Sequence, residues 1–149
     1  MSATIPGRPA PYAGRPAAGA ALYRRLIAAA LILTFGLVML GAYVRLSDAG
    51  LGCPDWPGCY GQLSPLHAKE EIARAVAEQG GEHGPVSMGK AWREMVHRYF
   101  AQALGLLIIA IAVVAWRRRA ELRQSPVLPI SLVGVVILQG IFGMWTVTL

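Results

Sequence analysis

Three ionisable residues stand together where a long apolar segment begins, and they are the first candidates for chemistry in this sequence. Glu94, His97 and Arg98 lie within one stretch of five residues, directly before 18 residues without a charge. In a helix, positions 94 and 97 share a face because they are about one turn apart. Ionisable groups in membrane helices are costly and indicate function by default. We therefore treat this stretch as a candidate site rather than as a solvated helix end.

Each of the three residues has a plausible task. A neutral imidazole at His97 is suited to binding a heme iron. Glu94 could orient that imidazole or transfer protons, and Arg98 could pair with a heme propionate or extend to the membrane interface. In the alternative interpretation, Glu94 and Arg98 only cap and anchor the helix. A di-iron site is excluded because it needs further carboxylates within the apolar segments, and the sequence has none there.

Arg45 follows another apolar segment and has two interpretations. It could be an interfacial arginine paired with Asp48. It could instead bind a carboxylate-bearing ligand, because a guanidinium offers two parallel donors to a carboxylate.

These candidates are positioned by long uncharged segments. Only 15% of the residues are charged and the mean hydropathy is +0.47, whereas soluble proteins carry about 25% charged residues. Uncharged segments of this length predict membrane-spanning helices and exclude a soluble enzyme, a disordered chain and a coiled coil. We expect an all-α fold, a polytopic membrane helix bundle with three transmembrane helices and a long outer loop. The expected spans are about 22–44, 94–116 and 127–148, with the outer loop at 45–93.

The positive charges predict the topology. A net charge of +6 would suggest nucleic-acid binding in a soluble protein, but here the arginines gather beside the spans, at Arg24, Arg25 and the segment 117–123. Because short basic segments stay in the cytoplasm, we expect the N-terminus and the second connection inside and the long loop outside. The expected surroundings are membrane lipid, with no nucleic-acid partner.

Cys53 and Cys59 are the only cysteines, and both fall in the expected outer loop. An even pair in an oxidising compartment predicts a disulfide, which could be structural or redox-active. A metal site is the third alternative, but the spacing of His67 and His83 resembles no common zinc motif.

Two further segments have local signals. Residues 1–21 are rich in Pro, Gly and Ala, and we expect a disordered cytoplasmic tail. Its prolines disfavour a mitochondrial transit peptide. The Ala- and Arg-rich composition of this tail favours a bacterial plasma membrane over the mitochondrial inner membrane. In the outer loop, Ser64 is expected to cap a short helix that starts at Pro65 and stops at Gly80–Gly81.

Three motifs together resemble the heme A synthase family. Residues 41–61 read GAYVRLSDAGLGCPDWPGCYG and are similar to that family's first outer loop. Residues 94–99, EMVHRY, resemble the opening of its second helix, and residues 139–147, QGIFGMWTV, resemble its third. The resemblance covers residues 22–149.

The resemblance implies a fold of eight helices in two four-helix halves, of which this chain would be part of the first. It also implies oxidation of a methyl group of heme O to the formyl group of heme A, for assembly of terminal oxidases. His97 matches a heme-ligand histidine, Glu94 a functional glutamate, and Cys53 and Cys59 the family's loop cysteines. A b-type heme is expected in the C-terminal half, which is missing here. The implied partners are heme O synthase as supplier, oxidase assembly factors, and an electron donor that the sequence does not identify.

Only three of the eight expected spans are present, and residues 22–149 would form an incomplete transmembrane domain. The chain is therefore expected to be inactive alone. The alternative function is a non-catalytic membrane module that binds heme or assists oxidase assembly.

Overall fold

The structure, a computed structural model, describes residues 18–81 and 84–148, and within these ranges it contains helices and no β-strand. Three helices are long and apolar enough to cross a membrane: α1 (Ala18–Leu46), α3 (Met88–Arg117) and α5 (Val127–Thr148). Two are short: α2 (Lys69–Glu78) and α4 (Arg119–Leu122). This confirms the prediction of an all-α, polytopic membrane bundle.

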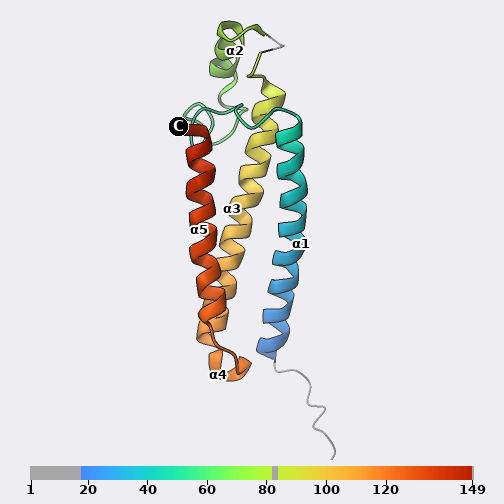
Figure 1. Ribbon diagram of the computed structural model, residues 1–149, viewed down its shortest axis with the longest axis vertical. Coiled ribbons are helices and arrows are strands. Elements are labelled where there is room, and N and C mark those ends of the chain that lie inside the picture. The colour runs from blue at the N-terminus through green and yellow to red at the C-terminus, as the bar shows by residue number, and fades with distance from the viewer. Residues whose placement is uncertain (1–17, 82–83, 149) are drawn as a thin grey trace, which may run out of the picture.

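The helix α3 is the centre of the bundle. It packs against α1 on one side and α5 on the other, whereas the described parts of α1 and α5 do not contact each other. Figure 1 shows the three long helices running alongside one another, with α2 and its connecting loops at one end and α4 at the other. Any group held between helices must therefore lie against α3.

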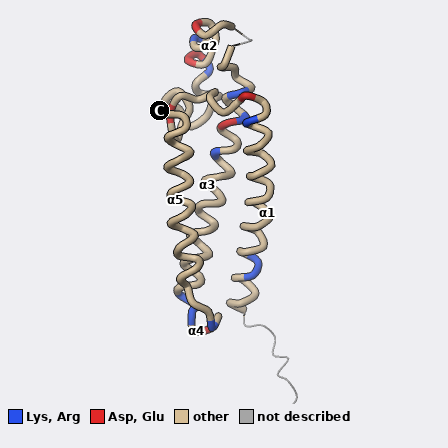
Figure 2. The backbone as a smooth tube through the Cα atoms, viewed as in Figure 1, with Lys and Arg blue, Asp and Glu red and all other residues tan. Residues whose placement is uncertain are grey.

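The outer surface of the bundle suits hydrocarbon. Large apolar side chains point outward from the long helices, among them Ile32 and Phe35 of α1, which are 74% and 71% exposed. Charged residues gather near the two ends of the bundle and are absent from its middle (Figure 2). Because exposed apolar surface of this extent is stable in lipid rather than in water, the chain is a multi-pass membrane protein.

The best-packed core lies at the loop end of the bundle rather than at its middle. It joins the start of α3 to α2 and to the segment with the two cysteines. Its buried members are Cys53, Cys59, Ala68, Ile72, Ala75, Val86, Ala91 and Met95. A second, smaller cluster at the other end contains Tyr23 of α1 with Ile111 and Ala115 of α3. The loop is thus part of the folded core.

The opposite end of α1 is fixed by a carboxylate. The backbone N–H of Gly19 donates to Oε1 of Glu121 in α4 at 3.0 Å. A side chain at position 19 would collide with that carboxylate, because a Cβ there would lie 2.4 Å from Oε1. Glu121 also lies 3.6 Å from Nη1 of Arg118. The carboxylate of Glu121 therefore accepts a hydrogen bond from an N–H at the start of α1 that has no partner within the helix, and it lies among the arginines of the α4 turn.

The starts of three helices differ from the sequence expectations: α1 begins before residue 22, α2 after residue 65 and α3 before residue 94. The expected tail, residues 1–21, falls mostly outside the described residues, but residues 18–21 belong to α1. The predicted cap of the loop helix is wrong: α2 begins at Lys69, and its N-cap residue Ala68 makes no side-chain hydrogen bond. Oγ of Ser64 instead accepts from the N–H of Leu66 at 3.2 Å, in a separate turn before the helix. The helix α3 starts at Met88, where Oγ of Ser87 accepts from the N–H of Lys90.

Candidate functional site

The loop between α1 and α2 is closed by a disulfide. Cys53 and Cys59 are bonded to each other, with their Cα atoms 4.8 Å apart, and both are fully buried. Inside this loop the carboxylate of Asp55 accepts from the N–H groups of Tyr60 at 2.5 Å and Gly61 at 2.7 Å. The predicted cysteine pair is confirmed as a disulfide, and it encloses a turn with its own hydrogen bonds.

Glu94 and Arg98 attach that loop to α3. Oε2 of Glu94 accepts from the N–H of Cys53 at 3.0 Å, and Oε1 accepts from Nη2 of Arg98 at 2.5 Å. Nη1 of Arg98 donates to the carbonyl oxygens of Asp55 and Gly58, both at 2.6 Å. Glu94 is 5% exposed and Arg98 is 7% exposed. We call these two residues the clamp.

The clamp changes the interpretation of Arg98. The sequence suggested that its side chain extends to the interface or pairs with a propionate, but the guanidinium is buried under the loop. The extension to the interface is therefore wrong. A propionate contact stays a prediction, and a propionate would have to compete with three loop carbonyls, those of Cys53, Asp55 and Gly58. Removing one member of a buried, hydrogen-bonded ion pair costs about 3–5 kcal/mol because the other charge is left uncompensated.

His97 faces a different neighbour from the clamp. It is half-buried on α3, and its imidazole lies against α1 at Gly41. A Cβ on Gly41 would lie 3.1 Å from Nε2 of His97 and 3.5 Å from Cδ2. The structure therefore brings Glu94 and Arg98 together under the loop and places His97 separately, in the interface between α1 and α3.

The side chains of Arg45 and Asp48 do not pair with each other. The carboxylate of Asp48 lies 3.2 Å from Nζ of Lys90, and within the described residues the side chain of Arg45 forms no ion pair or hydrogen bond. The two residues meet only through their backbones, where the N–H of Asp48 donates to the carbonyl oxygen of Arg45 at 3.2 Å. The predicted pairing of Arg45 with Asp48 is wrong. Arg45 is exposed near the end of α1, and its contact with an anionic ligand remains a prediction.

Tyr60 is a polar residue of the loop that the sequence did not single out. Partial burial raises the pKa of its phenol, and the nearby carboxylates of Asp55 and Glu94 raise this pKa further. The phenol is therefore neutral at physiological pH. Within the described residues, no three His, Cys, Asp or Glu side chains come close enough together to hold a metal ion.

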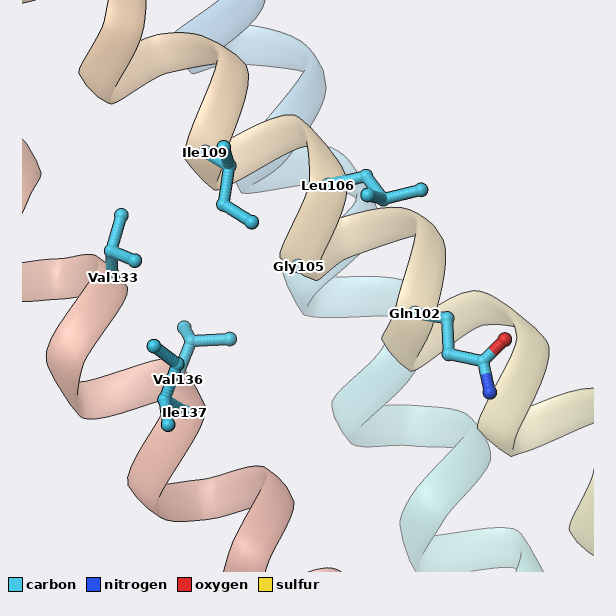
Figure 3. Close-up of a pocket in the computed structure, with 7 residues that line it drawn as sticks. All are labelled: Gln102, Gly105, Leu106, Ile109, Val133, Val136 and Ile137. Atoms are coloured by element: carbon cyan, nitrogen blue, oxygen red, sulfur yellow. The ribbon is translucent and has the colours of Figure 1, made fainter. Parts of the chain in front are cut away.

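An apolar groove runs along the interface of α3 and α5 (Figure 3). Its volume is about 390 Å³, and Gln102 is its one polar side chain. Its other lining residues are Gly105, Leu106 and Ile109 of α3 and Val133, Val136 and Ile137 of α5. His97 does not line it, so the groove and the histidine are separate features of α3.

Sequence reasoning missed the loop carbonyls that bind Arg98 and the contact of Gly41 with His97. The first had a partial signal, since Glu94 and Arg98 are four residues apart and such pairs interact on a helix. The second had none, because a glycine in an apolar helix looks the same whether it faces lipid or a histidine.

The comparison with known proteins decides the family. A sequence model of the family described as cytochrome oxidase assembly protein matches residues 24–149. The chain belongs to this family. Curated members similar to it are named heme A synthase: that of Shewanella oneidensis is 42% identical over 125 residues, and that of Mesorhizobium japonicum is 30% identical over 155 residues.

These relatives are much longer than the chain. The match covers 83% of this chain and 36% of the Shewanella protein, and 93% of this chain and 41% of the Mesorhizobium protein. The chain therefore corresponds to the N-terminal portion of a heme A synthase family member. No solved structure matches it significantly.

Proposed function

We propose that the chain is the N-terminal part of a heme A synthase and contributes to the oxidation of heme O to heme A for terminal oxidases. The match of residues 24–149 with the family carries this proposal, together with the names of the similar proteins. The reaction is a four-electron oxidation: two successive hydroxylations convert a methyl substituent into a gem-diol, which loses water to give the formyl group, and a co-reactant outside this chain supplies the oxidising equivalents. The porphyrin supplies the reacting carbon, and the protein binds it, orients it and handles protons.

His97 is the residue of this chain that we propose to contact the heme. It is the one histidine in the three long helices, and it lies half-buried between α1 and α3 rather than at the surface. The family resemblance of residues 94–99 supports the same role. Arg45 is the proposed anion contact, because it is exposed and free of carboxylate partners within the described residues.

Glu94 has two candidate roles. The resemblance supports a functional carboxylate that transfers protons. Its contacts support a second role as a member of the clamp, since both of its oxygens accept hydrogen bonds. The two roles make different predictions for Glu94→Gln, which are given below.

The remaining parts of the proposal concern what lies outside this chain. We propose that a b-type heme is held by the part of the protein that the relatives have and this chain does not. Heme O synthase would supply the substrate and oxidase assembly factors would receive the product. The similar proteins from Shewanella and Mesorhizobium are bacterial, which supports a bacterial plasma membrane over a mitochondrial inner membrane.

The test is heme A formation by the full-length gene product in a bacterial host that makes heme O but no heme A. Extracted hemes are separated and the ratio of heme A to heme O is measured. We expect heme A with the wild type and none with His97→Ala at equal membrane abundance. Wild-type heme A levels in His97→Ala would contradict the ligand assignment. Heme binding without any heme A from the wild type would favour the non-catalytic module.

A further inference from the structure

Gly41 and His97 meet where α1 and α3 pack against each other. The position of a Cβ on Gly41 is 3.1 Å from Nε2 of His97, closer than an ordinary van der Waals contact. The atom it would meet belongs to an imidazole ring, on a side chain with two rotatable bonds. An alanine at position 41 would therefore displace the ring by a few tenths of an ångström, or separate the two helices by as much.

We infer that Gly41 is a positioning residue for His97. Because glycine has no side chain, Gly41 leaves the space that the imidazole occupies between α1 and α3. The inference rests on the proposed function, in which His97 contacts the heme. Nε2, one of the two imidazole nitrogens that can bind an iron atom, faces α1 at Gly41. Gly41 leaves space beside this nitrogen, whereas a methyl group would press on it.

The glycines of α1 are not equivalent in this respect. Gly36 lies on the same helix, and nothing is found within 4 Å of the position of its Cβ. Gly36→Ala and Gly41→Ala make the same chemical change and bring the same gain in helix propensity. The two substitutions differ in what the new methyl group meets, so Gly36→Ala is a matched control.

The displacement expected at position 41, a few tenths of an ångström, takes up much of the positional tolerance of a ligand-binding side chain. Binding sites require their side chains within about 0.5 Å of the productive geometry. Gly41→Ala is expected to weaken heme binding about tenfold, in the range that an added methyl group costs in a packed interior. The electron paramagnetic resonance spectrum of the ferric heme should also change, because the strength of the iron–nitrogen bond depends on the orientation of the imidazole ring.

The test uses the full-length gene product, purified from membranes and titrated with hemin, in five forms: wild type, Gly36→Ala, Gly41→Ala, His97→Ala and the Gly41→Ala/His97→Ala double variant. Any heme site elsewhere in the protein is common to all five and cancels in the comparison. Absorption titration measures the affinity, and electron paramagnetic resonance of the ferric form measures axial ligation. We expect Gly36→Ala to match the wild type and Gly41→Ala to bind more weakly with an altered spectrum.

The double variant tests whether Gly41 acts through His97. Once the imidazole is gone, alanine at position 41 should cost no further affinity, so the two effects should not add. Gly41→Ala could also lower the protein yield. In that case the double variant should restore the yield, because removing the imidazole makes room for the methyl group.

Three results would overturn the inference. They are a Gly41→Ala protein that binds hemin and gives spectra like Gly36→Ala, an equal loss of affinity from Gly41→Ala with and without His97, or a low yield that the double variant does not restore. Failure of the proposed function looks different: in that case His97→Ala itself binds hemin with wild-type affinity and ligation.

Discussion

Glu94 and Arg98 form a buried ion pair one helical turn apart on α3, with Oε1 of Glu94 2.5 Å from Nη2 of Arg98. Both side chains also bond the disulfide loop, the glutamate through the N–H of Cys53 and the arginine through the carbonyls of Asp55 and Gly58. The pair therefore couples the loop to the helix that carries His97. A surface ion pair would contribute little, but this one is desolvated and its atoms have several partners.

Arg98→Met should destabilise the protein by about 3–5 kcal/mol, because it leaves the Glu94 carboxylate buried without its counter-charge. Thermal unfolding in detergent and limited proteolysis of the loop measure the effect. Lys90→Met is the control, since the ion pair of Lys90 with Asp48 includes a carboxylate that is 94% exposed. Removing this exposed ion pair should lower the free energy of unfolding by less than about 1 kcal/mol. Equal losses in the two variants would show that the clamp contributes nothing special.

Glu94→Gln separates the two candidate roles of the carboxylate. If Glu94 acts through the clamp, the amide leaves Arg98 with an unpaired buried charge, and stability, loop protection and heme A formation should fall together. If Glu94 transfers protons, heme A formation should fall while the melting temperature and the proteolysis pattern stay close to wild type. We expect the first pattern. A stable but inactive Glu94→Gln protein would disprove it.

Part of this site could be predicted from the sequence. The uncharged segments predicted three membrane helices because burying charge in lipid is costly, and the two cysteines predicted a disulfide from their compartment. The helix period placed Glu94 and His97 on one face, whereas the structure pairs Glu94 with Arg98.

The partners of Arg98 could not be predicted, because carbonyl acceptors depend on the turn conformation of residues 53–59 and not on their side chains. The same limit explains the error at Ser64, where a good capping residue bonds within its own turn instead of starting α2. The contact between Gly41 and His97 depends on the relative register of α1 and α3, which no single-helix pattern contains.

The double substitution of Cys53 and Cys59 by serine tests the purpose of the disulfide. The bond lies in a fully buried core next to the clamp, so its loss should destabilise the protein by about 2–4 kcal/mol and make the loop sensitive to protease. Protein yield and proteolysis measure this, and a thiol-specific mass tag applied before and after reduction verifies the bond in the wild type. Normal yield and loop protection, with heme A formation alone reduced, would indicate a redox-active pair instead.

Gly52→Ala tests how closely the loop must approach α3. A Cβ at position 52 would lie 2.7 Å from the backbone nitrogen of Ala91 and 2.9 Å from the carbonyl carbon of Lys90. These are helix backbone atoms that cannot rotate away, so the loop would have to lift from α3 and break the hydrogen bond between Cys53 and Glu94. We expect a loss of about 3 kcal/mol, at the upper end for an overpacked interior, together with faster proteolysis of the loop.

Gly50→Ala is the matched control for that experiment. It lies two residues away in the same loop, and nothing is found within 4 Å of the position of its Cβ. Both alanines restrict the unfolded chain equally, so the difference between their melting temperatures isolates the contact with α3. If Gly52→Ala melts at the same temperature as Gly50→Ala, the loop is not held tightly against the helix, and the clamp cannot transmit its position to α3. If Gly52→Ala lowers both the melting temperature and the affinity for heme, the contact of the loop with α3 is required to hold the region around His97 in place.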